Sequence, residues 1–214
     1  MKLYTYYRSS AAYRVRIALN LKGLDYDAVP IHLVKDGGRQ LAAEYRAVNP
    51  AGLVPALDDD GALFTQSLAI IEYLEETRPT PPLLPEDPAA RARARALALT
   101  IACDIHPINN MRVLKRLATQ FGATEEQKND WYRHWVENGL AEAEALLARS
   151  PDVGTFAQGD APGLADCFLA PQIFNARRFN CRVDHLPIIN RIVAACEELD
   201  AFRRAMPAQQ PDAE

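Results

Sequence analysis

A proline-rich stretch divides this chain of 214 residues into two parts of different character. Five of the fifteen prolines stand between Arg78 and Pro88. Because proline fixes φ and removes a backbone donor, no regular helix or strand can run through this segment. We therefore expect a linker over residues 81–88, between a first domain of residues 1–80 and a second domain of residues 89–214.

The first part alternates short β-prone runs with amphipathic segments, which predicts a small α/β domain. Pro30 restricts the second strand to a sheet edge or a bulge, and residues 58–61 are typical of a hairpin turn. The order of strands and helices is that of a thioredoxin-like domain, whose sheet combines a parallel β-α-β unit with an antiparallel hairpin. The expected strands are 3–7, 26–33, 55–57 and 62–64, and the expected helices are 11–22, 40–47 and 67–76.

The second part shows helical spacing of apolar residues and no convincing strand, which predicts an all-α bundle. Residues 207–214 are polar and indicate a frayed tail. The expected fold class is therefore an α/β thioredoxin-like N-terminal domain followed by an all-α C-terminal bundle. The expected helices of the second part are 91–121, 125–149, 164–179 and 187–204.

Composition excludes several function classes. A net charge of −4 provides no overall basic surface for a nucleic acid, and no apolar run approaches the ~20 residues that a membrane-spanning helix needs. The N-terminus lacks the features of a signal peptide. The four cysteines show no CxxC spacing, so we expect no disulfide framework and no metal site, and a cytoplasmic location.

Polar residues stand at two predicted helix starts. Ser9 and Ser10 lie where the first strand passes into a helix, and Gln66 and Ser67 lie at the start of the last helix of the first domain. Free N–H groups and the helix dipole favour an anion there, and a hydroxyl can stabilise a thiolate. The same residues also fit N-caps that need no ligand. Together the two starts suit a small peptide carrying carboxylates.

The run from Arg8 to Leu19, RSSAAYRVRIAL, resembles the signature of zeta-class glutathione transferases, which include the glutathione-dependent maleylacetoacetate and maleylpyruvate isomerases. The resemblance implies a thioredoxin-like domain that binds glutathione as a cofactor, a helical domain that binds a small dicarboxylate substrate, and a homodimer. It covers essentially the whole chain, continuing through residues 33–38, 49–57, 66–76, 164–166 and 170–179.

The resemblance also assigns roles to individual residues. Ser9 would face the glutathione sulfur, and Arg8 beside it would bind a substrate carboxylate. Gln66 and Ser67 would hold the γ-glutamyl carboxylate, and Val54 would pair through its backbone before a cis-Pro55, although most X-Pro bonds are trans. The other implied glutathione-binding residues are Ser10, Ala11, Gln40, His106 and Asn110, and Arg178 is the other implied substrate-binding residue. Arg112, two residues after Asn110, is a candidate for a third substrate-binding cation, and a solvated charge fits it equally well.

Two positions depart from the class pattern. Ala11 stands where the class commonly has cysteine, so no role of that cysteine applies here. Gly163 stands where a serine or threonine usually begins the capping box that Asp166 closes, which leaves Asp166 to satisfy backbone donors.

The implied activity is cis–trans isomerisation of maleylacetoacetate to fumarylacetoacetate in tyrosine degradation, by reversible addition of the glutathione thiolate. The alternatives are maleylpyruvate isomerisation in the gentisate pathway, conjugation of haloacids by a general glutathione transferase, and a non-catalytic binding protein on the same fold. The sequence does not separate the two isomerase substrates, because both present a cis double bond between carboxylates.

Overall fold

The computed structural model describes all 214 residues, and the chain divides into two compact units. The first unit contains Met1–Leu83 and Glu197–Glu214, and the helical unit contains Leu84–Cys196. The expected second domain of residues 89–214 differs from this division at its C-terminal end, because residues after Cys196 pack with the first unit.

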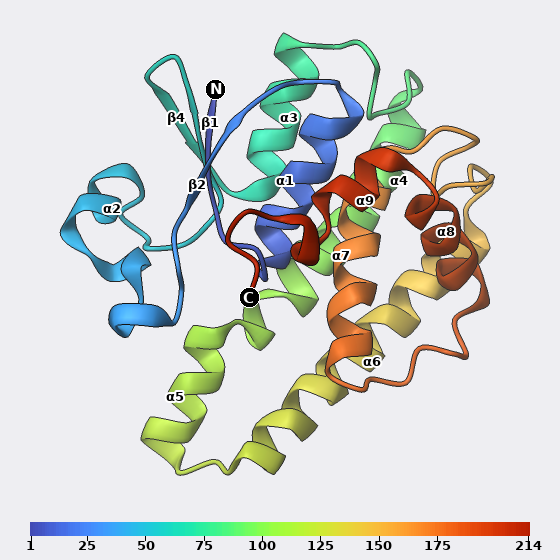
Figure 1. Cartoon of the computed structure of the whole chain (residues 1–214). Helices are drawn as coiled ribbons and strands as arrows, with labels where there is room; N and C mark the ends of the chain where they lie inside the picture. The colour runs from blue at the N-terminus through green and yellow to red at the C-terminus, as the bar shows by residue number, and fades with distance from the viewer. The chain divides into compact units, whose positions relative to one another are not determined.

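A four-stranded mixed sheet forms the centre of the first unit (Figure 1). Its strand order is β2-β1-β3-β4; β1 pairs parallel to β2 and antiparallel to β3, and β3 pairs antiparallel to β4. The thioredoxin-like prediction is confirmed, and Pro30 ends the edge strand β2, where its missing N–H costs no ladder hydrogen bond. The strands are β1 (Lys2–Thr5), β2 (Asp27–Pro30), β3 (Ala56–Asp59) and β4 (Ala62–Thr65).

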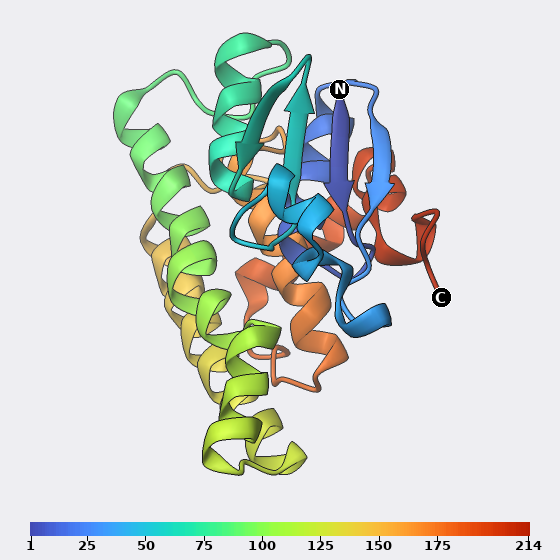
Figure 2. The ribbon, with the colours of Figure 1, turned by 90° about the vertical axis from the view of Figure 1, so that its left-hand side faces the viewer.

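Helices cover both faces of this sheet, as Figure 2 shows. The helices α1 (Ser10–Leu21) and α3 (Ser67–Thr77) lie on one face. The short helix α2 (Ala43–Val48) lies toward the other face of the sheet, where the centroids of the Tyr4 and Tyr45 rings are 5.8 Å apart. Side chains alternate between the faces of a strand, so β1 contacts helices on both sides.

The hairpin between β3 and β4 turns at Asp60 and Gly61, whose φ angles of 52° and 89° are those of a primed two-residue turn. The Asp58 carboxylate accepts a hydrogen bond from the Gly61 N–H at 2.8 Å. The predicted hairpin is therefore confirmed.

The C-terminal segment belongs to the first unit because α9 (Asp200–Ala205) packs on α1. The Asn20 side chain on α1 donates to the Ala201 carbonyl at 2.8 Å. The expectation of a frayed tail is wrong: Gln210 is buried and donates to the Arg204 and Met206 carbonyls at 2.8 and 2.9 Å. A 3₁₀ turn, η5 (Pro207–Gln209), leads into this contact.

The beginning of the proline-rich segment is held by a buried ion pair. Lys22, just past the end of α1, lies 2.7 Å from Glu75 on α3. The Lys22 ammonium also donates to the carbonyls of Arg78 and Pro81, at 2.8 and 2.9 Å. The segment is thus irregular, as its prolines require, but it is fixed to the first unit as far as Leu83.

The helical unit contains no strand longer than isolated bridges. The predicted helix 125–149 is confirmed, but the predicted helices 91–121 and 187–204 are each interrupted. The first breaks at a π-helical turn followed by Pro107, which removes an N–H donor and obstructs the preceding turn. The elements are α4 (Pro88–Leu99), η3 (Thr100–Ile105), η4 (Pro107–Asn109), α5 (Met111–Phe121), α6 (Glu125–Arg149), α7 (Leu164–Arg178) and α8 (Pro187–Glu197).

The start of α7 shows the half-formed capping box that the sequence predicts. Asp166 is fully buried and accepts hydrogen bonds from the N–H groups of Gly163 at 2.8 Å and Ala157 at 3.0 Å. Gly163 supplies no side chain in return, so Asp166 alone caps the helix and ties the preceding loop to it.

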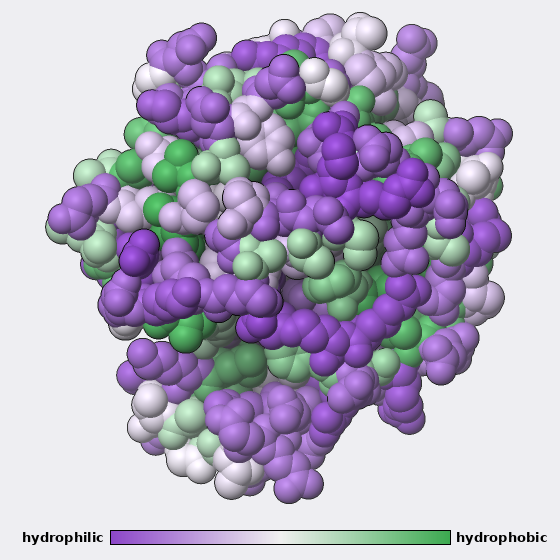
Figure 3. Space-filling model, viewed as in Figure 1, coloured by the Kyte–Doolittle hydropathy of each residue, from purple (hydrophilic) through white to green (hydrophobic).

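The surface seen in Figure 3 is mostly hydrophilic, with hydrophobic residues in small separate patches. None of the helices combines the length and the apolar character that crossing a membrane requires.

Candidate functional site

Ser9 forms the N-cap of α1. Its Oγ accepts a hydrogen bond from the Ala12 N–H at 3.2 Å, so the hydroxyl hydrogen remains available to an acceptor outside the helix. Ser10 and Ala11 are the first two residues of the helix and are buried. The N-cap interpretation of Ser9 is therefore correct, and it leaves a donor at the positive end of the helix dipole.

Arg8 precedes this N-cap and is exposed. Its guanidinium carbon lies 5.0 Å from the centroid of the Tyr7 ring, a cation–π distance that restricts where the side chain points. Burial raises the pKa of the neighbouring Tyr6 to about 12, so this phenol stays neutral and adds no negative charge beside Arg8.

The start of α3 carries the second pair of predicted residues. Gln66 has a φ of 68°, a conformation that a residue with a side chain rarely adopts, and it directly precedes the helix. Ser67 is the first residue of α3 and is buried. Its Oγ accepts a hydrogen bond from Nη1 of Arg14 on α1 at 3.2 Å. This bond joins the two helix starts on one side of the sheet.

The predicted cis bond between Val54 and Pro55 is present. The preceding carbonyl, that of Leu53, accepts hydrogen bonds from the Tyr45 hydroxyl and the Asn49 amide, each at 2.7 Å. No backbone hydrogen bond joins Val54 itself to the rest of the unit. Its N–H and C=O therefore remain available to an extended peptide.

Gln40 is half-buried in the loop between β2 and α2. Its amide nitrogen donates to the Leu33 carbonyl at 3.3 Å, while its Oε1 is buried without a hydrogen-bond donor. Two glycines with positive φ allow the chain to approach it: a Cβ on Gly38 would lie 2.7 Å from the Gln40 amide, and one on Gly52 would lie 2.9 Å from its carbonyl oxygen. The loop thus presents one unsatisfied acceptor.

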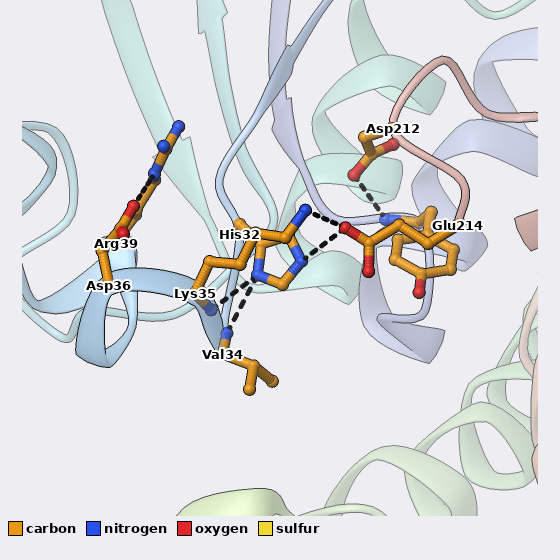
Figure 4. A network of polar contacts seen from close by, with 8 residues as sticks. His32, Val34, Lys35, Asp36, Arg39, Asp212 and Glu214 are labelled. Carbon is orange, nitrogen blue, oxygen red and sulfur yellow. Dashed lines mark hydrogen bonds and ion pairs between the residues drawn. The ribbon is translucent and has the colours of Figure 1, made fainter.

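A network of contacts from the C-terminal tail holds the same loop, as Figure 4 shows. Nδ1 of His32 accepts hydrogen bonds from the N–H groups of Val34 at 3.1 Å and Lys35 at 2.9 Å, and Nε2 lies 3.4 Å from the Glu214 carboxylate. Lys35 forms an ion pair with Glu214 and thereby lowers the pKa of that carboxyl. Asp212 accepts a hydrogen bond from the Tyr7 N–H at 3.0 Å. Sequence reasoning missed this network, because its partners lie far apart along the chain.

Four predicted residues belong to the helical unit. His106 is half-buried after the π-helical turn η3. Asn110 is the N-cap of α5, and its Oδ1 accepts a hydrogen bond from the Arg112 N–H at 3.1 Å. Arg112 and Arg178 are both exposed, and the Arg178 guanidinium lies 5.1 Å from the Phe179 ring centroid. A capping role thus accounts for the observed contact of Asn110, and its role toward a ligand stays a prediction.

The first unit therefore contains two serine-bearing helix starts, a loop with an open backbone at Val54 and a loop with an open amide oxygen at Gln40. These four features supply donors or acceptors suited to a peptide with a carboxylate and a thiol. Sequence reasoning expected Arg14 to form a structural ion pair and did not predict its contact with Ser67, which lies on another helix.

The chain is similar to proteins of known activity. Residues 3–82 match the family model described as glutathione S-transferase, N-terminal domain. A maleylpyruvate isomerase from Ralstonia sp. is 51% identical over 99% of both chains. A maleylacetoacetate isomerase from Pseudomonas aeruginosa is 52% identical over 99% of this chain and 98% of the relative.

Solved structures agree with these relatives. A holo structure of maleylpyruvate isomerase, described as a bacterial zeta-class glutathione S-transferase, superposes with a TM-score of 0.96 at 51% identity over the whole of both chains. The maleylacetoacetate isomerase from Methylobacterium extorquens AM1, solved with bound malonate and glutathione, has a TM-score of 0.95 at 45% identity over the whole of both chains. The chain belongs to the glutathione S-transferase family, as a member of its zeta class.

Proposed function

We propose that this protein is a glutathione-dependent cis–trans isomerase that converts maleylacetoacetate to fumarylacetoacetate. The observation that carries the proposal is the hydroxyl of Ser9, which accepts from Ala12 and so keeps its hydrogen for an anion at the start of α1. The near full-length identity with isomerases supports the same reaction class.

The residues of the first unit fit glutathione. The buried hydroxyl of Ser67 at the start of α3 suits the γ-glutamyl carboxylate, together with Gln66 before it. The unpaired backbone of Val54 suits the extended peptide, and Oε1 of Gln40 suits an N–H donor. Each of these groups has bonding capacity that the protein itself does not use.

Glutathione, when bound, supplies a thiol sulfur that adds reversibly to a conjugated double bond, permits rotation about the resulting single bond, and leaves again. Ser9 holds this sulfur as a thiolate by donating its hydroxyl hydrogen, and the first N–H groups of α1, at Ser10 and Ala11, add to the positive potential there. Arg8 holds a substrate carboxylate with two parallel hydrogen bonds and favours negative charge developing next to it.

The proposal also includes cations and polar residues of the helical unit. Arg178 and Arg112 are exposed guanidinium groups available to a dicarboxylate. His106 and Asn110 are further candidates for contact with glutathione. Single alanine variants distinguish the two roles. Replacing Arg178 or Arg112 is expected to raise KM for the substrate, and replacing His106 or Asn110 is expected to lower the affinity for glutathione.

The decisive experiment is an assay of maleylacetone isomerisation with and without glutathione. We expect turnover that requires glutathione and does not consume it. Isomerisation at the same rate without glutathione, or no isomerisation with or without it, would refute the proposed function.

The role of Arg8 has a separate test. We expect Arg8→Ala to lower kcat/KM by about 10²-fold to 10³-fold, the usual effect of deleting one group that stabilises developing charge. Its affinity for glutathione should stay close to that of the wild type. Arg46→Ala is the matched control, because Arg46 is an exposed arginine on α2 outside the proposed site. Equal turnover in the two variants would exclude Arg8 from the reaction.

Maleylpyruvate isomerisation is the second candidate, because the Ralstonia relative of that name is as similar as the maleylacetoacetate isomerase of P. aeruginosa. The ratio of kcat/KM for maleylpyruvate and maleylacetone decides between them. A higher rate with a chlorinated acid than with either would instead indicate a conjugating transferase.

We further propose a homodimer acting in the cytoplasm. Leu63 on the edge strand β4 is 46% exposed, an apolar side chain available to a second copy of the chain. Four free cysteines fit a reducing compartment. Light scattering after size-exclusion chromatography measures the mass, and a Leu63→Lys variant is expected to shift it toward that of one chain.

A further inference from the structure

Arg14 is a cationic side chain inside the first unit that the proposed reaction does not use. It lies one turn into α1 and is only 2% exposed. Its Nη1 donates a hydrogen bond to Oγ of Ser67, 6% exposed, at 3.2 Å. A guanidinium brought out of water in this way needs a specific reason to be there.

The direction of this hydrogen bond determines what Ser67 can do. A guanidinium contains only N–H donors, so the Ser67 oxygen must act as the acceptor in this contact. The single hydroxyl hydrogen of Ser67 is therefore left to donate elsewhere. A partner at the start of α3 then has to be an acceptor, and the helix dipole favours a negatively charged one.

The positive charge of Arg14, like its hydrogen bond to Ser67, favours a negatively charged partner at the start of α3. A guanidinium behind the hydroxyl places a positive charge within the buried part of the unit, where electrostatic interactions are stronger than in water. The geometry points to Arg14 as a positioning residue that orients the Ser67 hydroxyl toward an ionised carboxylate and so makes the protein select a peptide that carries one there. This inference rests on the proposed function insofar as that carboxylate is the γ-glutamyl carboxylate of glutathione.

The test compares two ligands that differ only in this carboxylate: glutathione and 4-aminobutyryl-cysteinylglycine, which lacks it. Calorimetric titration of the wild type is expected to give an affinity for glutathione at least about 10-fold higher than for the analogue, because the analogue lacks a charged hydrogen-bond acceptor. The ratio of these two affinities is the quantity compared between variants. In Arg14→Met this ratio should fall at least about 5-fold. In Arg14→Lys, which keeps a cationic donor but loses the planar guanidinium, the affinity ratio should lie between those of the wild type and Arg14→Met.

Two further variants separate positioning from a structural role. Ser67→Ala should lower the ratio by itself, and adding Arg14→Met to it should lower the ratio no further, since the two residues act through one bond. Lys22→Met is the matched control: it removes another buried cation of the first unit, so it should lower stability and leave the ligand ratio unchanged.

If Arg14 has only a structural role, Arg14→Met will weaken the binding of both ligands equally and leave the affinity ratio unchanged. That result would overturn the inference. If Arg14→Met does not fold, Arg14→Lys with the wild-type ratio has the same meaning. The isomerase assay on the wild type is independent: discrimination by carboxylate without isomerisation would remove the proposed reaction and leave the role of Arg14 intact.

Discussion

Removal of the buried ammonium of Lys22 is expected to lower the stability of the protein strongly. The Lys22 side chain is fully buried, and its three N–H donors meet three acceptors: Glu75 at 2.7 Å and the carbonyls of Arg78 and Pro81 at 2.8 and 2.9 Å. Glu75 in turn accepts from the Leu83 N–H with both carboxylate oxygens, at 3.1 and 3.0 Å. One ion pair thus fixes the chain where it leaves the first unit.

Lys22→Met keeps much of the side-chain volume and deletes the charge. The variant leaves the Glu75 carboxylate buried without this cation, a change that costs about 3–5 kcal/mol when one partner of a buried pair is removed. Each of the two carbonyls also loses a donor, at about 1 kcal/mol. Because these effects overlap, we expect the free energy of unfolding to fall by about 4 kcal/mol.

Urea unfolding at pH 7, followed by far-ultraviolet circular dichroism, measures this change. The double variant Lys22→Met/Glu75→Gln removes the unpaired charge while an amide oxygen still accepts from Leu83, so it should be more stable than Lys22→Met alone. Lys128→Met breaks a surface ion pair with Glu125 and should cost at most about 0.5 kcal/mol. A loss below about 1 kcal/mol in Lys22→Met, or a double variant no more stable than the single one, would refute the reasoning.

Two other changes have outcomes that the structure determines. Burial raises the pKa of Asp166 to about 6, so its folded form binds a proton more tightly than the unfolded chain. Its contribution to stability is complete below pH ~4 and falls by about 3 kcal/mol as the pH rises through 6. The difference in unfolding free energy between the wild type and Asp166→Asn should therefore shrink between pH 4.5 and 7.5, and a constant difference would contradict the raised pKa. Glu214→Gln weakens the contact with Lys35, so trypsin should cleave after Lys35 faster than in the wild type or in the control Glu126→Gln; equal rates would show that the tail does not hold this loop.

Local signals in the sequence predicted most of the secondary structure. The prolines after Arg78 ended regular structure, Gly61 after three aspartates predicted the hairpin, and helical spacing of apolar residues predicted the long helix 125–149. These signals act within a few residues, so they can be read without the fold. The same holds for Ser9 as the N-cap of α1.

Elements whose limits depend on packing were predicted poorly. The expected helix 91–121 contains a π-helical turn, in which Ile105 packs onto Gly139 so closely that a Cβ at Gly139 would lie 2.3 Å from the Ile105 side chain. Helical periodicity alone does not reveal such a turn, because the apolar spacing of the segment stays helical. The expectation of a frayed tail was wrong for a related reason: the contacts of Asp212 with Tyr7 and of Glu214 with Lys35 join residues 205 and 179 positions apart, and no local pattern predicts them.

The candidate site divides in the same way. Sequence by itself determined the serines at the two helix starts, the proline after Val54 and the overall family, because these are residue types at short spacings. Only the tertiary structure decided that Arg14 on α1 meets Ser67 on α3, that Lys22 holds the proline-rich segment, and that Glu214 reaches Lys35. The physical reason is that a buried charge or hydroxyl takes its function from the partner that the fold places beside it, and those partners lie tens to hundreds of residues away along the chain.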